Sequence, residues 1–393
     1  MFKKSLDRQP KSRYTILEHV LKFQSVREEH VSREDAGRMN TWNAPLPQSD
    51  WKHSAWGLPD LSIGRRPGWN PQQSPGAETK TDGTASELAR EVLQCLFQHR
   101  RLLPEAGACA DTPCSLCLAP HLSKVRRAIE RREPIHLVLP AFPAKSPSRR
   151  KTFGPLPDKA EELALESLQS LCNAIQLLYA PGARLTLCSD GRVFSDLVGV
   201  TEEDVTRYGQ EIRTMIRRLG LRSLDTFHLE DRFTGDTFQE MRDLMETQYA
   251  EPYAQFAARV QKDNPILLNG IERFLLEERS PDAPALSKTQ ARKEARTRAI
   301  EVVRRSEAWG RLIAERFPSA LRLSIHPQMP HSPKIGLRMG EQGKDLWITP
   351  WHGVAVQEAG GWTLRKREEA EALGAQLVER EGRPYYYTLE VGR

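Results

Sequence analysis

Apolar positions along the chain recur at helical or strand spacing from residue 86 onward. Side chains three or four residues apart predict helices at 87–98, 121–132 and 157–181. The third helix begins at Pro157-Asp158, has Glu161 and Glu162 in its first turn and stops at Pro181-Gly182, which are typical start and stop signals. Mainly apolar runs at 135–142 and 183–189 predict buried strands.

The order of these elements predicts the fold class. A helix that begins at Thr201 and a third apolar run at 221–229 extend the alternation of strands and helices. This order predicts an α/β fold with a mainly parallel, Rossmann-like central sheet and flanking helices. Ligands in such sheets bind at the loops that follow the carboxyl ends of the strands.

Composition divides the chain into three parts. Residues 1–85 are predicted to form a loop-rich extension with one helix at 12–35, because 40–84 are rich in Pro, Gly, Asn, Gln and Trp without periodicity. Residues 86–285 are predicted to form the α/β core. Residues 286–393 contain a long charged helix at 287–317 and then short strand-like runs, and so predict a β-rich C-terminal part that completes the site.

Charge and hydropathy narrow the class of protein. The net charge is +6, but 52 acidic residues are interspersed among 58 basic ones, which favours a local site for an anionic small molecule over a nucleic-acid surface. The basic helix at 288–305 contains glutamates among its cations and indicates a solvated face. Without a membrane-length apolar run or a signal sequence, a cytoplasmic protein without membrane contact is expected.

The six cysteines are expected to be free thiols. Cys109, Cys114 and Cys117 form a C-x4-C-x2-C pattern that is reminiscent of a metal site. A structural zinc needs a fourth ligand, and His121 is the nearby candidate. Small buried thiols account for the same pattern, so no metal is expected.

The loop after the first predicted strand concentrates positive charge. Four cations lie within seven residues, namely Lys145, Arg149, Arg150 and Lys151. Arginine and lysine make charge-assisted hydrogen bonds to phosphate or carboxylate oxygens. The alternative is a solvated basic loop.

The second predicted strand ends in Ser189-Asp190-Gly191-Arg192. Asp190 is a candidate base or ammonium-binding group, and Arg192 is a candidate anion-binding group. An Asx turn with a structural pair between Asp190 and Arg192 is the alternative.

Further candidates lie in the C-terminal third. His326 and His352 each stand next to a proline-containing break in a strand-like run, and histidine transfers protons near neutral pH. Lys334 would add positive charge, and Trp351 is a candidate for substrate contact. Either histidine is otherwise a buried, hydrogen-bonded side chain. A different reading combines His228, Glu230 and His326 into an iron-binding facial triad of a non-haem oxygenase.

Three ordered blocks carry a resemblance to a known family. The blocks are 137–168, 178–200 and, in pieces, 322–356, within a match that spans about 86–393. Together they resemble the pyoverdine/dityrosine biosynthesis family, which includes isocyanide synthases. The resemblance implies a redox-neutral transferase or lyase of secondary metabolism that converts the α-amine of tryptophan or tyrosine into an isonitrile. Ribulose 5-phosphate would donate the carbon, and no cofactor is expected.

The same resemblance implies roles for the candidate residues. Lys145, Arg149 and Lys151 would hold the sugar phosphate. Asp190 and His352 would transfer protons, with His326 behind them, and Arg192 or Lys334 would bind the carboxylate of the amino acid. A formamide-producing enzyme of the dityrosine-type branch is the alternative within the family. An iron- and 2-oxoglutarate-dependent oxygenase is expected as a pathway partner.

Overall fold

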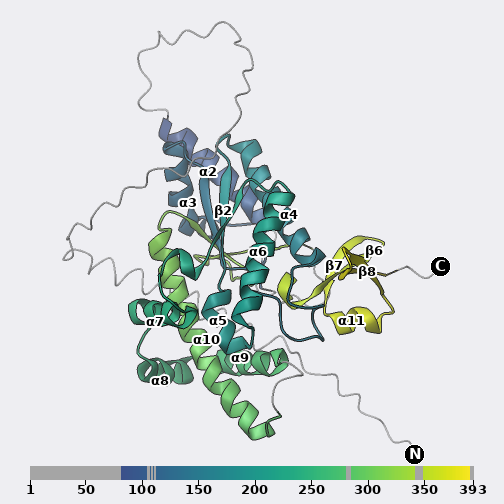
Figure 1. Ribbon diagram of the computed structural model, residues 1–393. Helices are drawn as coiled ribbons and strands as arrows, with labels where there is room; N and C mark the ends of the chain where they lie inside the picture. Colours follow the sequence, from purple (N-terminus) through teal and green to yellow (C-terminus); the bar gives the residue numbers. More distant parts are fainter. Residues whose placement is uncertain are drawn as a thin grey trace, which may run out of the picture.

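The computed structural model in Figure 1 describes residues 81–103, 107, 109, 112–279, 285–340 and 348–389. All but the last residues of the predicted N-terminal extension, with its helix at 12–35, lie outside the described residues. Within the described part, no helix is both long enough and apolar enough to cross a bilayer. The body begins with two helices, α2 (Thr81–Gln98) and α3 (Ser115–Glu130).

The centre of the molecule is a five-stranded parallel sheet in the order β3-β2-β1-β4-β5, which confirms the predicted fold class. Its strands are β1 (Ile135–Leu139), β2 (Ala183–Cys188), β3 (Leu224–Phe227), β4 (Leu321–Ser324) and β5 (Ile335–Gly336). The strand order reverses between β1 and β4. In sheets of this type, ligands bind outside the carboxyl ends of the strands at such a switch point.

Helices cover both faces of the sheet (Figure 1). Leu137 of β1 packs in one core cluster with side chains of α2, α4 and α6, whereas Val138 packs in another with Trp309 and Met245. The two faces alternate because successive strand side chains point in opposite directions. The helices that follow β1 are α4 (Lys159–Leu178), α5 (Gly191–Val198), α6 (Glu202–Arg218), α7 (Phe238–Tyr249), α8 (Tyr253–Asp263), α9 (Pro265–Glu278) and α10 (Lys288–Arg316).

Local capping explains where the predicted helices begin. Asp158 accepts a hydrogen bond from the Ala160 N–H, and Glu161 reaches back to the Asp158 N–H, which is a capping box at the start of α4. Thr201 caps α6 by accepting from the Asp204 N–H. Both starts agree with the sequence signals, whereas α5 and α7–α9 were not predicted.

A second sheet forms the C-terminal part, in the order β7-β6-β9-β8. Its elements are β6 (Val354–Glu358), β7 (Gly361–Arg365), α11 (Arg367–Ala372), β8 (Gln376–Arg380) and β9 (Arg383–Thr388). It packs beside α4, where the Tyr385 hydroxyl donates to Glu162 at 2.6 Å. Because β4 and β5 join the central sheet, residues from both sides of the predicted boundary at 285 build one sheet.

Gly191 marks a close approach between the loops that follow β1 and β2. A Cβ at this position would overlap the Pro143 carbonyl oxygen and lie 2.8 Å from Val205 Cγ1. We expect Gly191→Ala to lower the free energy of unfolding by about 2–4 kcal/mol, because backbone must shift to make room. Urea denaturation measures this.

Gly310, inside α10, provides the matched control for this substitution. A Cβ there meets nothing within 4 Å, so Gly310→Ala is expected to stabilise the protein by about 0.5–1 kcal/mol through helix propensity. Equal stability of the two variants would contradict the importance of the contact at Gly191.

Candidate active site

Asp190 lies at the carboxyl end of β2 and is the N-cap residue of α5. The neighbouring Ser189 Oγ donates a hydrogen bond to the Phe142 carbonyl at 3.0 Å, so the loops after β1 and β2 are in contact. Asp190 is half-buried. Burial raises the pKa of its carboxyl to about 6, against the opposing effects of a backbone hydrogen bond and the Arg322 charge. A carboxyl with this pKa is suited to proton transfer near neutral pH.

His326 follows β4 on the other side of the switch point. Burial lowers the pKa of its imidazole to about 4, and the charges of Arg101, His352 and Lys334 add to the effect. The ring is therefore neutral at pH 7. The charges of two other predicted site residues thus act on His326: Lys334 from the same connection between β4 and β5, and His352 from a separate segment.

His352 ends a short 3₁₀ turn, η3 (Pro350–His352). Its Nδ1 lies 2.8 Å from Thr349 Oγ1, and its ring meets Phe274 of α9 edge-on at 5.4 Å between centroids. Near them, Glu278 accepts hydrogen bonds from Ser146 Oγ and Lys151 Nζ. Burial alone would raise the pKa of Glu278, but the charges of His352 and Lys151 outweigh it and lower the pKa.

Glu278 and Phe274 are site residues that the sequence analysis missed. Both belong to α9, which was not predicted, and no strand end or motif in the sequence singles them out. Lys151 connects them to the basic loop, since its Nζ lies 5.4 Å from the centre of the Phe274 ring.

Lys145 does not lie where the sequence analysis expected it. Its side chain is fully buried, with Nζ 2.8 Å from Asp158 Oδ2 and 2.9 Å from Glu161 Oε2. The same ammonium donates to the carbonyls of Pro350 at 3.0 Å and Gly353 at 3.2 Å. An ammonium has three N–H donors, so these partners leave none for a phosphate. Lys145 instead ties the start of α4 to the segment that carries His352.

The Arg192 side chain is also enclosed by protein partners. Its guanidinium bonds to the Glu202 carboxylate at 2.8 Å and to Thr206 Oγ1 at 2.5 Å, and stacks 3.5 Å from the centre of the Phe238 ring. It is buried. The alternative pair with Asp190 is not formed, and the guanidinium that was predicted to bind a substrate carboxylate binds Glu202 and Thr206 instead, because α5 and α6 close around this side chain.

Trp351 is buried and packs against Phe142, with 5.3 Å between ring centroids. Its ring therefore anchors η3 to the loop after β1. Arg149, in contrast, is exposed at the surface of the basic loop.

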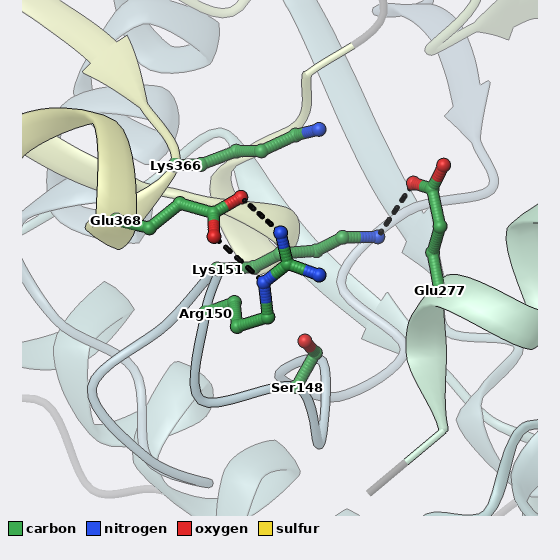
Figure 2. Close-up of a pocket in the computed structure, with 6 residues that line it drawn as sticks. All are labelled: Ser148, Arg150, Lys151, Glu277, Lys366 and Glu368. Carbon is green, nitrogen blue, oxygen red and sulfur yellow. Dashed lines mark hydrogen bonds and ion pairs between the residues drawn. The ribbon is translucent and has the colours of Figure 1, made fainter. Parts of the chain in front are cut away.

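A polar pocket of about 170 Å³ opens beside this loop (Figure 2). It is lined by Ser148, Arg150, Lys151, Glu277, Lys366 and Glu368. Arg150 makes a bidentate pair with Glu368 at 2.6 and 3.1 Å, and Lys151 Nζ lies 3.8 Å from Glu277. Lys151 thus stands between this pocket and the Glu278 and His352 group. The lining carries three cations, Arg150, Lys151 and Lys366, against the two carboxylates of Glu277 and Glu368, and this excess of positive charge suits an anionic group.

The alternative iron site is not assembled. His228 follows β3, which β2 and β1 separate from β4 and His326. Its Nε2 lies 2.9 Å from a guanidinium nitrogen of Arg213, which is a hydrogen-bond partner and not a metal ligand. Within the described ranges, the side chains that gather as possible metal ligands are a different set, centred on Cys114.

Part of the basic helix that raised the nucleic-acid alternative is paired within the protein, whereas Arg292, Lys293 and Arg298 are exposed. Arg304 and Arg305 of α10 are buried, and both bond to Glu246; Arg305 also reaches Asp196 at 2.7 Å. Arg296 donates to Asn269 at 3.0 Å. These cations pack helices together, which is the ordinary use of interleaved charge.

Comparison with known proteins agrees with this arrangement. The model of the pyoverdine/dityrosine biosynthesis protein family matches residues 125–378. An L-tryptophan isonitrile synthase from Fischerella ambigua is 46% identical over 302 residues, which cover 76% of this chain and 91% of that protein. An L-tyrosine isonitrile synthase from Pseudomonas aeruginosa is 41% identical over 311 residues, covering 77% and 94%. The chain therefore belongs to the pyoverdine/dityrosine biosynthesis family.

A solved structure shows the same fold. The crystal structure of the PvcA protein from Pseudomonas aeruginosa superposes with a TM-score of 0.70 at 41% identity, covering 77% of this chain and 99% of that one. The family resemblance drawn from the sequence blocks is thereby confirmed.

Proposed function

We propose that this protein is an isonitrile synthase that converts the α-amine of an aromatic L-amino acid, tryptophan or tyrosine, into an isonitrile with ribulose 5-phosphate as the carbon donor. The observation that carries the proposal is the identity of 39–46% to tryptophan and tyrosine isonitrile synthases over three quarters of the chain. Tryptophan is the first substrate to test, since the two tryptophan enzymes share 46% and 44% identity and the two tyrosine enzymes 39% and 41%.

The proposed reaction forms a bond between the amine nitrogen and a sugar carbon and then breaks the other bonds of that carbon, with proton transfers at each step. The amine adds to the sugar ketone and water leaves to form an imine, after which phosphate and the remaining sugar carbons are expelled. Asp190, with a pKa of about 6, accepts a proton from the substrate ammonium so that the amine can attack. His352, fixed by Thr349, transfers protons in later steps, and the neutral His326 accepts a hydrogen bond or a proton.

We assign the binding of the sugar phosphate and of the amino-acid carboxylate to positively charged side chains of the site. Lys151 and Lys366, with Arg149 and Arg150 nearby, hold the sugar phosphate at the pocket of Figure 2. Lys334 holds the amino-acid carboxylate beside His326. Lys145 and Arg192 take no part in binding, because both are enclosed by protein partners. They position the segments that carry His352 and Asp190.

The deciding experiment supplies ribulose 5-phosphate labelled at C2 together with tryptophan or tyrosine and follows the products by mass spectrometry. Label in an isonitrile carbon supports both the reaction and the carbon donor. A labelled formamide would point instead to the formamide-producing alternative. Absence of any sugar-dependent product with all proteinogenic amino acids would overturn the proposal.

The pocket assignment makes a separate prediction. Lys151→Met is expected to raise the KM for ribulose 5-phosphate by about 10- to 100-fold, because a charge-assisted bond to phosphate contributes about 1.5–3 kcal/mol. Initial rates at varied sugar phosphate measure it. Lys159→Met is the control, since Lys159 faces Trp362 and Glu162, and it should leave this KM within about twofold. An unchanged KM in Lys151→Met would move the phosphate elsewhere.

A further inference from the structure

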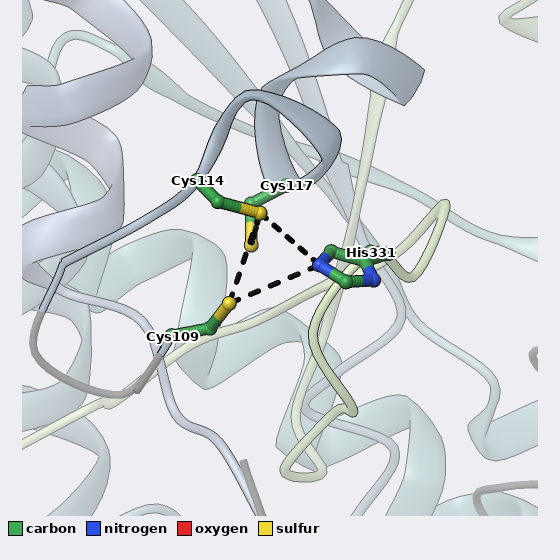
Figure 3. A group of neighbouring side chains, drawn as sticks. All are labelled: Cys109, Cys114, Cys117 and His331. Atoms are coloured by element: carbon green, nitrogen blue, oxygen red, sulfur yellow. Dashed lines mark hydrogen bonds between the residues drawn. The ribbon is translucent and has the colours of Figure 1, made fainter. Parts of the chain in front are cut away.

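A second cluster of reactive side chains lies apart from the candidate active-site residues. Three thiols from the start of α3 and the segment before it converge with an imidazole from the connection between β4 and β5 (Figure 3). The cluster consists of Cys109, Cys114, Cys117 and His331. Their four ligand atoms all lie within 4.8 Å of one another.

The spacing of these atoms matches a tetrahedral metal site. Cys114 Sγ lies 3.8 Å from the sulfurs of both Cys109 and Cys117, and His331 Nε2 lies 3.2 Å from Cys114 Sγ and 3.8 Å from Cys109 Sγ. A tetrahedral zinc with bonds of about 2.3 Å to sulfur and 2.0–2.1 Å to nitrogen requires edges of about 3.8 Å between sulfurs and about 3.6 Å between sulfur and nitrogen. The sulfurs are too far apart for disulfides, which join them at about 2.05 Å.

The backbone holds the ligands in this arrangement. Cys114 is the N-cap residue of α3, and the Cys117 N–H donates to the Cys114 carbonyl at 3.1 Å, which turns both thiols to one side. His331 has a φ of 67°, a left-handed conformation that is uncommon for a residue with a side chain. Such local strain persists where the surroundings impose it, often at ligand sites. Figure 3 shows the His331 ring directed at the sulfurs.

We propose that Cys109, Cys114, Cys117 and His331 bind one structural zinc ion. Four protein ligands close the coordination sphere and leave no position for a substrate. The ion would join the segment before α3 to the connection between β4 and β5, whose ends carry His326 and Lys334. A zinc of this kind positions that connection and does not react.

The sequence analysis expected no metal and gave His121 as the nearby candidate for a fourth ligand; in the structure His331 takes that place. His121 is buried, lies edge-on to Phe97 and bonds to the backbone of Ser332. It therefore supports the His331 segment from within the protein. The true fourth candidate is 217 residues from Cys114 along the chain, beyond the spacing of any short motif.

Metal analysis of the intact protein tests the proposal without reference to catalysis. Protein purified with reductant and without chelator is expected to contain about one zinc per chain by inductively coupled plasma mass spectrometry. The Cys114→Ser and His331→Ala variants are expected to contain less than about 0.2 zinc per chain. Cys95→Ser is the matched control, since Cys95 lies on α2 outside the cluster, and it should keep the full zinc content.

Cobalt substitution of the wild-type protein gives a second readout that needs no variant. Cobalt in this site is expected to show the visible absorption of a tetrahedral ion and a thiolate charge-transfer band. Wild-type protein that holds neither zinc nor cobalt, that holds iron instead, or that forms a disulfide among these cysteines would overturn the proposal. Full zinc content in Cys114→Ser would also overturn it.

Discussion

Asp190→Asn is expected to reduce kcat for isonitrile formation by about 10²- to 10⁴-fold, the usual contribution of a positioned general base. In the wild-type protein, kcat/KM should fall as the pH drops below about 6, because the carboxyl of Asp190 then becomes protonated. The variant should lack this limb of the pH profile. Steady-state rates between pH 5 and 8 measure both effects.

The same substitution should make the protein more stable. The pKa of Asp190 is raised from 3.8 to about 6 in the folded state, so folding binds a proton that is lost again as the pH rises. The contribution of Asp190 to stability therefore declines between about pH 4 and 6, and the stability of the wild type relative to the variant falls by the same amount over this range. Above pH 6, Asp190→Asn should gain about 1–2 kcal/mol, less than the full shift implies because the side chain is only half-buried.

Asp225→Asn is the control for both measurements. Asp225 is an exposed residue of β3, and its change should leave rate, pH profile and stability close to wild type. If Asp190→Asn kept kcat within about threefold, Asp190 would not be the base, and His352 would take its place as the leading candidate.

Lys145→Met is expected to have the largest effect on stability, a loss of about 3–5 kcal/mol in the free energy of unfolding. The ammonium balances Asp158, whose side chain is 2% exposed. Burial raises the pKa of both Asp158 and Glu161, and the charge of Lys145 lowers it in each, so the ammonium is the counter-ion of this buried carboxyl pair. Removing Lys145 leaves a buried carboxylate without its counter-ion. Urea denaturation at pH 7 measures the loss.

A double variant separates this charge effect from lost packing. Lys145→Met with Asp158→Asn removes both charges and keeps an oxygen to cap Ala160, so it should recover at least half of the loss. Lys293→Met, at an exposed position of α10, should change stability by less than about 0.5 kcal/mol. A stable Lys145→Met variant with a raised KM for the sugar phosphate would instead return Lys145 to the phosphate site.

Local signals account for the parts of the fold that were predicted. The apolar runs of β1 and β2 and the caps at Asp158 and Thr201 act over a few residues, so they can be read in order along the chain. The helices α7 and α8 were missed because each buries only two or three side chains, too few for a clear stripe.

The candidate site residues were likewise found from local signals, whereas their partners in the structure were not. Asp190 was found because it follows a predicted strand in a parallel sheet, where the edge of the sheet gathers such positions. His326 was found because it stands next to a proline-containing break in a strand-like run. Lys145 and Arg192 were found by the same rule as Asp190, but their partners come from other segments. Residue type alone does not distinguish a cation that faces a ligand from one that two buried carboxylates enclose.

Periodicity, caps and residue types along the chain were thus sufficient for the α/β class and for the main strands and helix caps, and the resemblance of three sequence blocks was sufficient for the family. The three-dimensional structure was needed to place β4 beside β1, to bring Glu278 to His352, to enclose Lys145 and to bring His331 to the three cysteines. These outcomes depend on contacts between residues far apart in the chain. Such contacts are settled by which surfaces pack and which charges are buried together, and no local pattern in the sequence records them.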